Sequence, residues 1–118
     1  NAVANVLVDL QDYKCFYCNK PMRNGNYAVD HFIPWSMYPS DTGHNFVLAD
    51  SSCNSKKSNL LASDEFLHKW QERNEEQNLI IVGRISVLGF LTDKERSHKV
   101  AEWAYAQGKE NNYGIWNI

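Results

Sequence analysis

Hydrophobic and polar positions divide this 118-residue chain into short predicted elements. Residues 3–12 (VANVLVDLQD) have the spacing of a short amphipathic helix. Residues 27–30 and 46–49 have the character of strands, and a 13-residue loop over 32–44, with two prolines and a glycine, joins them. Loops of this length inside a compact domain are often functional. The first half is therefore predicted to hold a helix and two strands that flank a long loop.

The second half of the chain is predicted to be helical. We expect helices over 52–61, from Ser63 onward, over 79–89, and from the capping-box sequence Thr92–Glu95 to about Gln107. Residues 79–89 combine helical spacing with many β-branched side chains, and we favour a helix over a strand there. The expected N-caps are Asp50 or Ser51, Ser63 and Thr92, and the expected C-terminal stop is Gly108.

Composition narrows the class of protein. No apolar run approaches the roughly 20 residues of a membrane-spanning helix. The net charge of −2 argues against a broad nucleic-acid-binding surface, although residues 14–57 hold five bases and three acids. The length fits one domain, which we expect over 3–118, with a core over 13–62 and a helical extension over 63–118. Because the chain begins with Asn rather than Met, we expect the natural protein to extend upstream.

The cysteines predict a structural zinc site. Cys15 and Cys18 have the spacing of a metal knuckle, and Asp50 and Cys53 repeat the same gap. We favour Asp50 as the fourth ligand, with His44, water or no metal at all as the alternatives. Three cysteines are a poor disulfide framework, so we expect a reducing, cytoplasmic location.

A second group of residues has the chemistry of phosphodiester hydrolysis. Asp30 and Asn54 offer oxygen ligands to Mg²⁺ or Mn²⁺ and leave positions open for water and a substrate phosphate. His31 is suited to act as a general base near neutral pH. Lys57, three residues after Asn54 on the predicted helix, is expected to reach a phosphate. Asn45 is expected to hold the His31 ring or to pin the loop.

Two points of geometry and surface chemistry follow. Asp30 and His31 would point to opposite faces of a regular strand, so the strand has to end or bend there if both serve one site.

Lys56 is expected to contact nucleic-acid phosphates. Trp35 either packs the loop or lies against a nucleotide. His68 and His98 fall in predicted helices and are not expected to act in catalysis.

The run VDHFIP…GHNFVLADSSCNSKK, together with CFYC, resembles the HNH endonucleases over about residues 15–62. The resemblance implies an α+β fold with a ββα-metal (His-Me finger) core of hairpin plus helix, a zinc knuckle and further helices packed around it. It implies that His31 is the general base, that Asp30 and Asn54 hold the catalytic ion, and that Asn45 is the middle Asn of the motif. Asp50 departs from the family's second C-x-x-C pair.

The expected activity is therefore metal-dependent cleavage of DNA, with RNA as a further possible substrate. We expect a bacterial setting, with restriction, phage defence, a mobile element and repair left open, and recognition by an upstream domain, a partner or dimerisation. The alternatives from other classes are a zinc-stabilised nucleic-acid-binding module without catalysis and a purely structural zinc domain in a larger assembly. A divalent ion at Asp30 and Asn54, within reach of His31, would distinguish the two.

Overall fold

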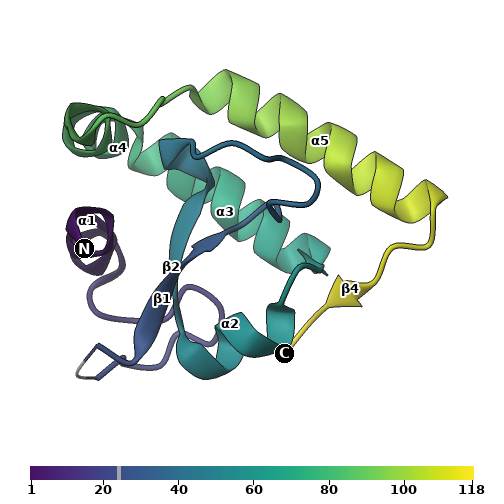
Figure 1. The fold of residues 1–118 in the computed structure, drawn as a ribbon, viewed down its shortest axis with the longest axis horizontal. Helices are drawn as coiled ribbons and strands as arrows, with labels where there is room; N and C mark the ends of the chain where they lie inside the picture. Colours follow the sequence, from purple (N-terminus) through teal and green to yellow (C-terminus); the bar gives the residue numbers. More distant parts are fainter. Residues whose placement is uncertain (24) are drawn as a thin grey trace.

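The computed structural model describes residues 1–23 and 25–118, and its centre is a β-hairpin followed by a helix. Strands β1 (Tyr27–His31) and β2 (Phe46–Asp50) are antiparallel, with Tyr27 opposite Asp50 and His31 opposite Phe46. Helix α2 (Ser51–Lys57) follows β2 without a break and contacts both strands (Figure 1). The predicted α+β architecture with a ββα core is therefore confirmed.

Helix α1 (Ala2–Gln11) lies along one side of the hairpin. The Oδ1 atom of Asn1 accepts a hydrogen bond from the backbone N–H of Ala4 at 2.8 Å, so the helix begins one residue before the predicted start. Its apolar face, which includes the fully buried Leu7, packs into the same core as β2. The amphipathic pattern of residues 3–12 thus predicted this element.

Three further helices complete the fold: α3 (Asp64–Glu76), α4 (Asn78–Ile85), which packs against α1, and α5 (Lys94–Glu110). Trp70 of α3 is fully buried and stacks on Phe32, with 4.9 Å between ring centroids and an interplanar angle of 12°. The favoured helix over 79–89 is confirmed as far as Ile85, after which Ser86–Leu88 continue as a 3-10 turn. No helix among the described residues is both long and apolar enough to cross a membrane.

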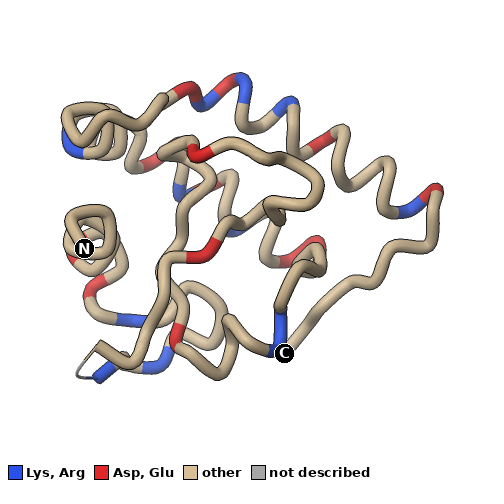
Figure 2. The backbone as a smooth tube through the Cα atoms, viewed as in Figure 1, with Lys and Arg blue, Asp and Glu red and all other residues tan. Residues whose placement is uncertain are grey.

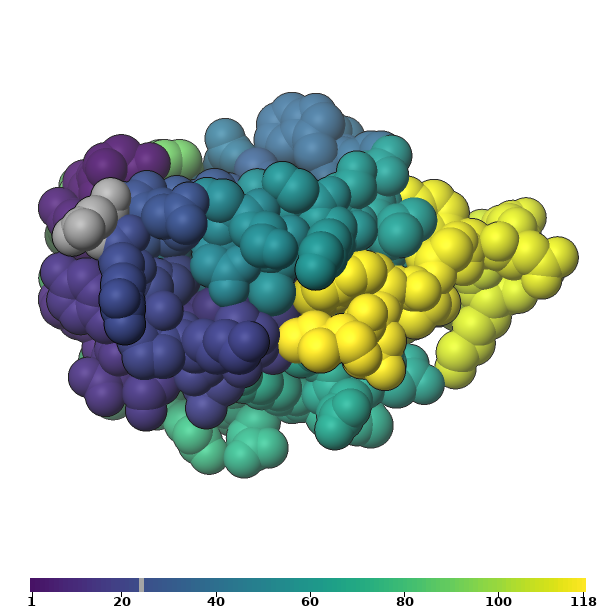
Figure 3. Space-filling model, turned by 90° about the horizontal axis from the view of Figure 1, so that it is seen from below, coloured from purple at the N-terminus to yellow at the C-terminus, as the bar shows by residue number. Residues whose placement is uncertain are grey.

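The predicted helix over 52–61 is too long. It ends at Lys57 because Ser58 adopts a positive φ of 50°, and Leu61–Ala62 form strand β3 instead. β3 pairs in parallel with β4 (Ile115–Trp116), which had no signal in the sequence. Figure 3 shows the result: the last residues of the chain lie against both the segment near residue 20 and the segment near residue 60.

Helix α5 differs from its prediction at both ends. Asp93 rather than Thr92 is the N-cap, and its Oδ1 accepts from the N–H of Arg96 at 3.0 Å. The helix continues through Gly108 to Glu110. A Cβ atom at Gly108 would lie 2.8 Å from Cδ1 of Leu61. Gly108 is therefore the point where α5 approaches β3 closely, and it does not stop the helix.

Candidate metal centre and hairpin site

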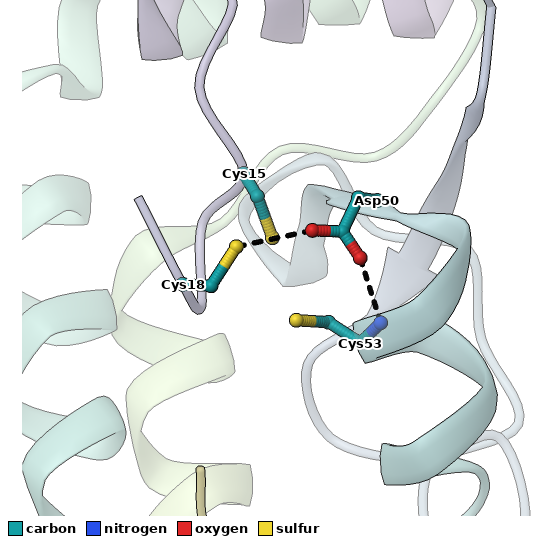
Figure 4. A group of neighbouring side chains, drawn as sticks. All are labelled: Cys15, Cys18, Asp50 and Cys53. Atoms are coloured by element: carbon teal, nitrogen blue, oxygen red, sulfur yellow. Dashed lines mark hydrogen bonds between the residues drawn. The ribbon is translucent and has the colours of Figure 1, made fainter. Parts of the chain in front are cut away.

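The structure brings Cys15, Cys18, Asp50 and Cys53 together (Figure 4), and we call these four residues the cysteine cluster. One ligand atom from each residue lies within 4.8 Å of all the others. A tetrahedral zinc site with Zn–S bonds of about 2.3 Å separates its ligand atoms by about 3.8 Å. The cluster is thus close to zinc geometry, and three sulfurs with one carboxylate oxygen are a chemically suitable donor set.

Hydrogen bonds already organise the cysteine cluster. Oδ1 of Asp50 accepts from the backbone N–H of Cys53 at 2.7 Å, which makes Asp50 the N-cap of α2 as predicted. Oδ2 of Asp50 accepts from the thiol of Cys18 at 3.0 Å. Although partial burial opposes it, these hydrogen bonds lower the pKa of Asp50. Burial raises the pKa of the Cys18 and Cys53 thiols, so metal binding there has to displace protons.

His44 does not belong to the cysteine cluster. It belongs to the 3-10 turn η1 (Gly43–Asn45) and is fully buried. Its Nε2 atom lies 2.8 Å from Oδ1 of Asn78 in α4. Its backbone carbonyl accepts from the indole N–H of Trp70 at 2.8 Å and from the Arg73 guanidinium at 2.8 Å. The alternative in which His44 completes the zinc site is therefore wrong, because packing of α3 and α4 holds this histidine in the core.

Asp30 lies at the inner face of β1 with little exposure (8 %). Its Oδ2 atom accepts from the hydroxyl of Tyr17 at 2.6 Å and lies 3.3 Å from Nζ of Lys57. Burial, followed by the Asp30 charge, raises the pKa of Tyr17 well above its usual range, so the hydroxyl keeps its proton and donates. Among the described residues, Oδ1 of Asp30 has no hydrogen-bond partner, which leaves that oxygen available to a ligand.

His31 points to the opposite side of β1. Its Nε2 atom lies 2.7 Å from Oδ1 of Asp41, and its ring lies edge-on to Trp35 and Phe46 with 5.5 Å between centroids in each case. β1 ends at His31, which meets the requirement that the strand end or bend there. The backbone turn after His31 therefore decides whether both side chains can serve one site.

One cavity does join them. A hollow of about 290 Å³, which we call the hairpin cavity, is lined by Asp30, His31, Pro34, Trp35, Ser36, Ser58 and Asn59. Trp35 is 51 % exposed there, so its side chain lines the cavity and is not buried in the core. A planar group of a ligand can therefore stack on the indole ring.

Asn45 holds the turn after His31. Its Oδ1 atom accepts from the N–H of Ile33 at 2.8 Å, and its Nδ2 atom donates to the carbonyl of Ile33 at 3.0 Å. The backbone carbonyl of Asn45 also accepts from the N–H of Phe32 at 2.8 Å. Of the two expectations for Asn45, the geometry matches the one in which its amide pins the loop, and not the one in which it holds the His31 ring.

The lysines of α2 differ sharply from each other. Lys56 is exposed, as expected of a phosphate contact. Lys57 is fully buried, and its Nζ atom donates to the carbonyl of His31 at 3.1 Å as well as contacting Asp30. Burial lowers the pKa of Lys57, and Asp30 opposes that effect. This position differs from the predicted phosphate contact, because the aliphatic stem passes through the core and the ammonium ends on groups of the protein.

Asn54 lies one turn before Lys57 on α2 and is half-buried. The two residues share a helix face, as their spacing predicted, and Lys57 contacts Asp30, but Asn54 is not among the residues that line the hairpin cavity. One carboxylate oxygen and one amide oxygen form a sparse donor set. Such a set fits an ion like Mg²⁺, which keeps several waters and binds substrate phosphates.

The sequence analysis missed three residues near these sites. Tyr17 sits inside the cysteine knuckle, and nothing in its spacing indicated a contact with Asp30. Asp41 lies in the long loop, where the length of the loop was the available signal. Arg73 is buried on α3 and donates to the carbonyls of His44 and Phe46, while burial lowers its pKa to about 10. These contacts fix the start of β2.

Comparison with known proteins agrees with this geometry. Residues 15–63 match the family model described as HNH endonuclease. No curated protein matches the chain. The matched segment begins at Cys15 and runs through the hairpin and α2 to the end of β3, so it contains both the cysteine cluster and Asp30–His31. Residues 15–63 are therefore similar to the HNH endonucleases, and this segment holds the residues that carry the candidate chemistry.

Proposed function

We propose that this protein is a metal-dependent endonuclease that hydrolyses DNA phosphodiester bonds at the hairpin cavity. One observation carries the proposal: within the family-matched segment, a histidine and a carboxylate on successive residues line one solvent-open cavity from different sides. A non-catalytic binding module has no need of this pair. The match of residues 15–63 to the HNH endonuclease model suggests nuclease activity, and the substrate and residue roles below are the proposal.

His31 takes the proton from the attacking water. Asp41 supports this role because its carboxylate, 2.7 Å from Nε2, accepts the N–H of that ring nitrogen and leaves Nδ1 as the basic atom. Trp35 and Phe46 limit rotation of the imidazole by edge contacts. Asn45 fixes the backbone turn that follows, so the ring is held in position relative to the cavity.

Oδ1 of Asp30 and the side-chain amide of Asn54 would hold a Mg²⁺ or Mn²⁺ ion. When bound, such an ion supplies charge stabilisation for the phosphate oxygens during displacement. Lys57 lies 3.3 Å from Asp30 and balances much of its negative charge. The site therefore attracts a cation only weakly by itself, and the phosphate of the substrate would supply the remaining negative charge. Tyr17 and Lys57 both contact Oδ2 and thereby orient the carboxylate.

The substrate contacts are proposed from exposure and charge. Lys56 is exposed on α2 and Trp35 is exposed at the cavity, so Lys56 is available to a phosphate and Trp35 to a base. Figure 2 shows basic residues along the lower edge of the molecule, whereas α5 carries mixed charges. Zinc in the cysteine cluster would fix the start of α2 and thereby the helix that carries Asn54. Recognition by a second copy or an upstream segment stays a prediction.

The test is relaxation of supercoiled plasmid by the purified protein with Mg²⁺, Mn²⁺ or EDTA, with His31→Ala beside the parent. We expect metal-dependent nicking and a loss of at least about 100-fold in His31→Ala, the scale of general-base catalysis. His68→Ala is the matched control, since His68 is an exposed histidine on α3 outside the hairpin cavity. Nicking by His31→Ala at the parent rate would contradict the proposal. DNA binding without nicking in any lane would favour the binding module.

A further inference from the structure

Tyr17 connects the two candidate metal sites. It lies between Cys15 and Cys18 in the knuckle and is almost fully buried (4 % exposed). Its hydroxyl donates to Oδ2 of Asp30 at 2.6 Å. A residue whose backbone belongs to one site therefore touches the carboxylate of the other.

The cysteine knuckle determines where this hydroxyl lies. The backbone N–H of Tyr17 donates to Sγ of Cys15 at 3.4 Å. The position of the Tyr17 backbone therefore depends on the position of the sulfur that would bind zinc. The adjacent Phe16 N–H donates to the carbonyl of Leu48 in β2 at 2.9 Å. A change in the knuckle would thus move the phenol relative to the hairpin.

Aromatic packing removes the remaining freedom of the Tyr17 ring. Phe66 of α3 and Trp116 of β4 contact it edge-on, with centroid distances of 5.2 and 5.0 Å. Phe66 and Trp116 in turn stack on each other with an interplanar angle of 12°. The ring cannot swing away without disturbing this set, so the hydroxyl presents a fixed donor to Asp30.

We propose that Tyr17 is a positioning residue that couples the cysteine cluster to the divalent-ion site at Asp30, by fixing the carboxylate so that Oδ1 faces a ligand. The inference rests on the proposed function, because it presumes an ion at Asp30. Coupling between two sites is reciprocal, so an ion at Asp30 also strengthens zinc binding in the cysteine cluster. Residues that orient a ligating carboxylate typically change metal affinity by about 10- to 100-fold.

The experiment compares Tyr17→Phe with Tyr105→Phe. Both substitutions delete one buried tyrosine hydroxyl and keep the ring; the Tyr105 hydroxyl donates to the carbonyl of Ala62 at 2.7 Å, away from Asp30. Each is placed in a His31→Ala background, bound to a short DNA duplex that this background does not cut. The readouts are the Mn²⁺ dissociation constant by electron paramagnetic resonance, the zinc content and the thermal melting temperature.

We expect Tyr17→Phe to weaken Mn²⁺ binding by about 10- to 100-fold at unchanged zinc content, and Tyr105→Phe to leave Mn²⁺ binding unchanged. Equal Mn²⁺ affinity in Tyr17→Phe and the parent would overturn the coupling while leaving the proposed function intact. Absence of Mn²⁺ binding to the His31→Ala parent would overturn the ion site itself, and the coupling with it.

A second measurement stands even if Tyr17→Phe does not fold. In the His31→Ala parent on the same duplex, zinc is withdrawn by a zinc-selective chelator with and without saturating Mg²⁺. Reciprocity predicts that Mg²⁺ raises the chelator concentration needed for half-removal. Zinc removal that is insensitive to Mg²⁺ would contradict the proposal.

Discussion

The cysteine cluster and the Asp30–His31 site differ in how completely the protein supplies their ligands. In the cluster, four ligand atoms from two chain segments converge within 4.8 Å of one another. At Asp30, one carboxylate oxygen is already occupied by Tyr17 and Lys57, and His31 points to a different partner. The first site is nearly closed by protein atoms, whereas the second opens into the hairpin cavity.

Under the proposed function, this difference separates a site that would hold the fold from a site that would react. A closed donor set binds its ion without substrate and stabilises the segments it joins. A sparse donor set needs water or a phosphate to complete the coordination of its ion. The buried Lys57 strengthens the contrast, because its charge already balances Asp30 in the free protein.

The largest expected effect is loss of the closed site. Cys15→Ser removes one sulfur from the cluster and should abolish most of the stability of the hairpin unit, on the order of several kcal/mol, since structural zinc supplies folding free energy. Thermal melting followed by circular dichroism, with zinc content measured in parallel, checks this. An unchanged melt with zinc retained would show that the two sites do not differ in the way described. Chelation of zinc from the parent should have the same effect.

The next effect tests the buried charge at the open site. Lys57→Met leaves Asp30 without its cation and the His31 carbonyl without a donor, so we expect a loss of about 3–5 kcal/mol in the free energy of unfolding. Lys56→Met, one residue earlier and exposed, should change it by less than about 0.5 kcal/mol. Urea denaturation of both variants measures the difference. Equal values for the two would mean that the Asp30–Lys57 pair carries no stability.

A smaller effect concerns activity alone. Asp41→Asn should reduce kcat by roughly tenfold, well below the about 10⁴-fold cost of the same change in a buried serine-protease triad, because the His31–Asp41 pair is partly exposed. KM for DNA should stay unchanged, since Asp41 acts on His31. Steady-state nicking kinetics separate the two constants. A change in KM with kcat intact would assign Asp41 to substrate binding.

The smallest effect is on the pH dependence of stability. It shows whether the loss of stability in acid comes from the cysteine cluster or from the histidines that pack against the helices. Burial lowers the pKa of His44, and burial also lowers that of His98. The unfolded chain therefore binds more protons below about pH 6.5, so stability falls as the pH drops through that range. His44→Gln should flatten the fall between pH 6.5 and 5.5, measured by urea denaturation with zinc in excess. The exposed His68→Gln should leave the slope as it is.

The elements that could be predicted from the sequence are those with local signals. The C-x-x-C spacing and the Asp50–Cys53 repeat predicted a cluster that the structure brings together. The order of strand, loop, strand and helix followed from short-range patterns and capping residues.

The features that could not be predicted depend on contacts between distant segments. A spacing of three residues placed Asn54 and Lys57 on one helix face, but it did not give the depth to which Lys57 is buried. The two-residue strands β3 and β4 are too short to have a period, and their pairing joins residues far apart in the chain. The close approach at Gly108 depends on Leu61 from β3, so the helix-stop prediction failed for the same reason.

The pairing of β3 with β4 also has a consequence for synthesis of the protein on the ribosome. All of residues 15–63 leave the ribosome before Trp116 is added, and at about 5–20 residues per second the delay is roughly 3 to 10 seconds. During that interval all four residues of the cysteine cluster are present, while the Tyr17 ring lacks the indole that will pack against it. Translation therefore orders the two events: the cysteine cluster is complete first, and the tyrosine beside Asp30 is packed last.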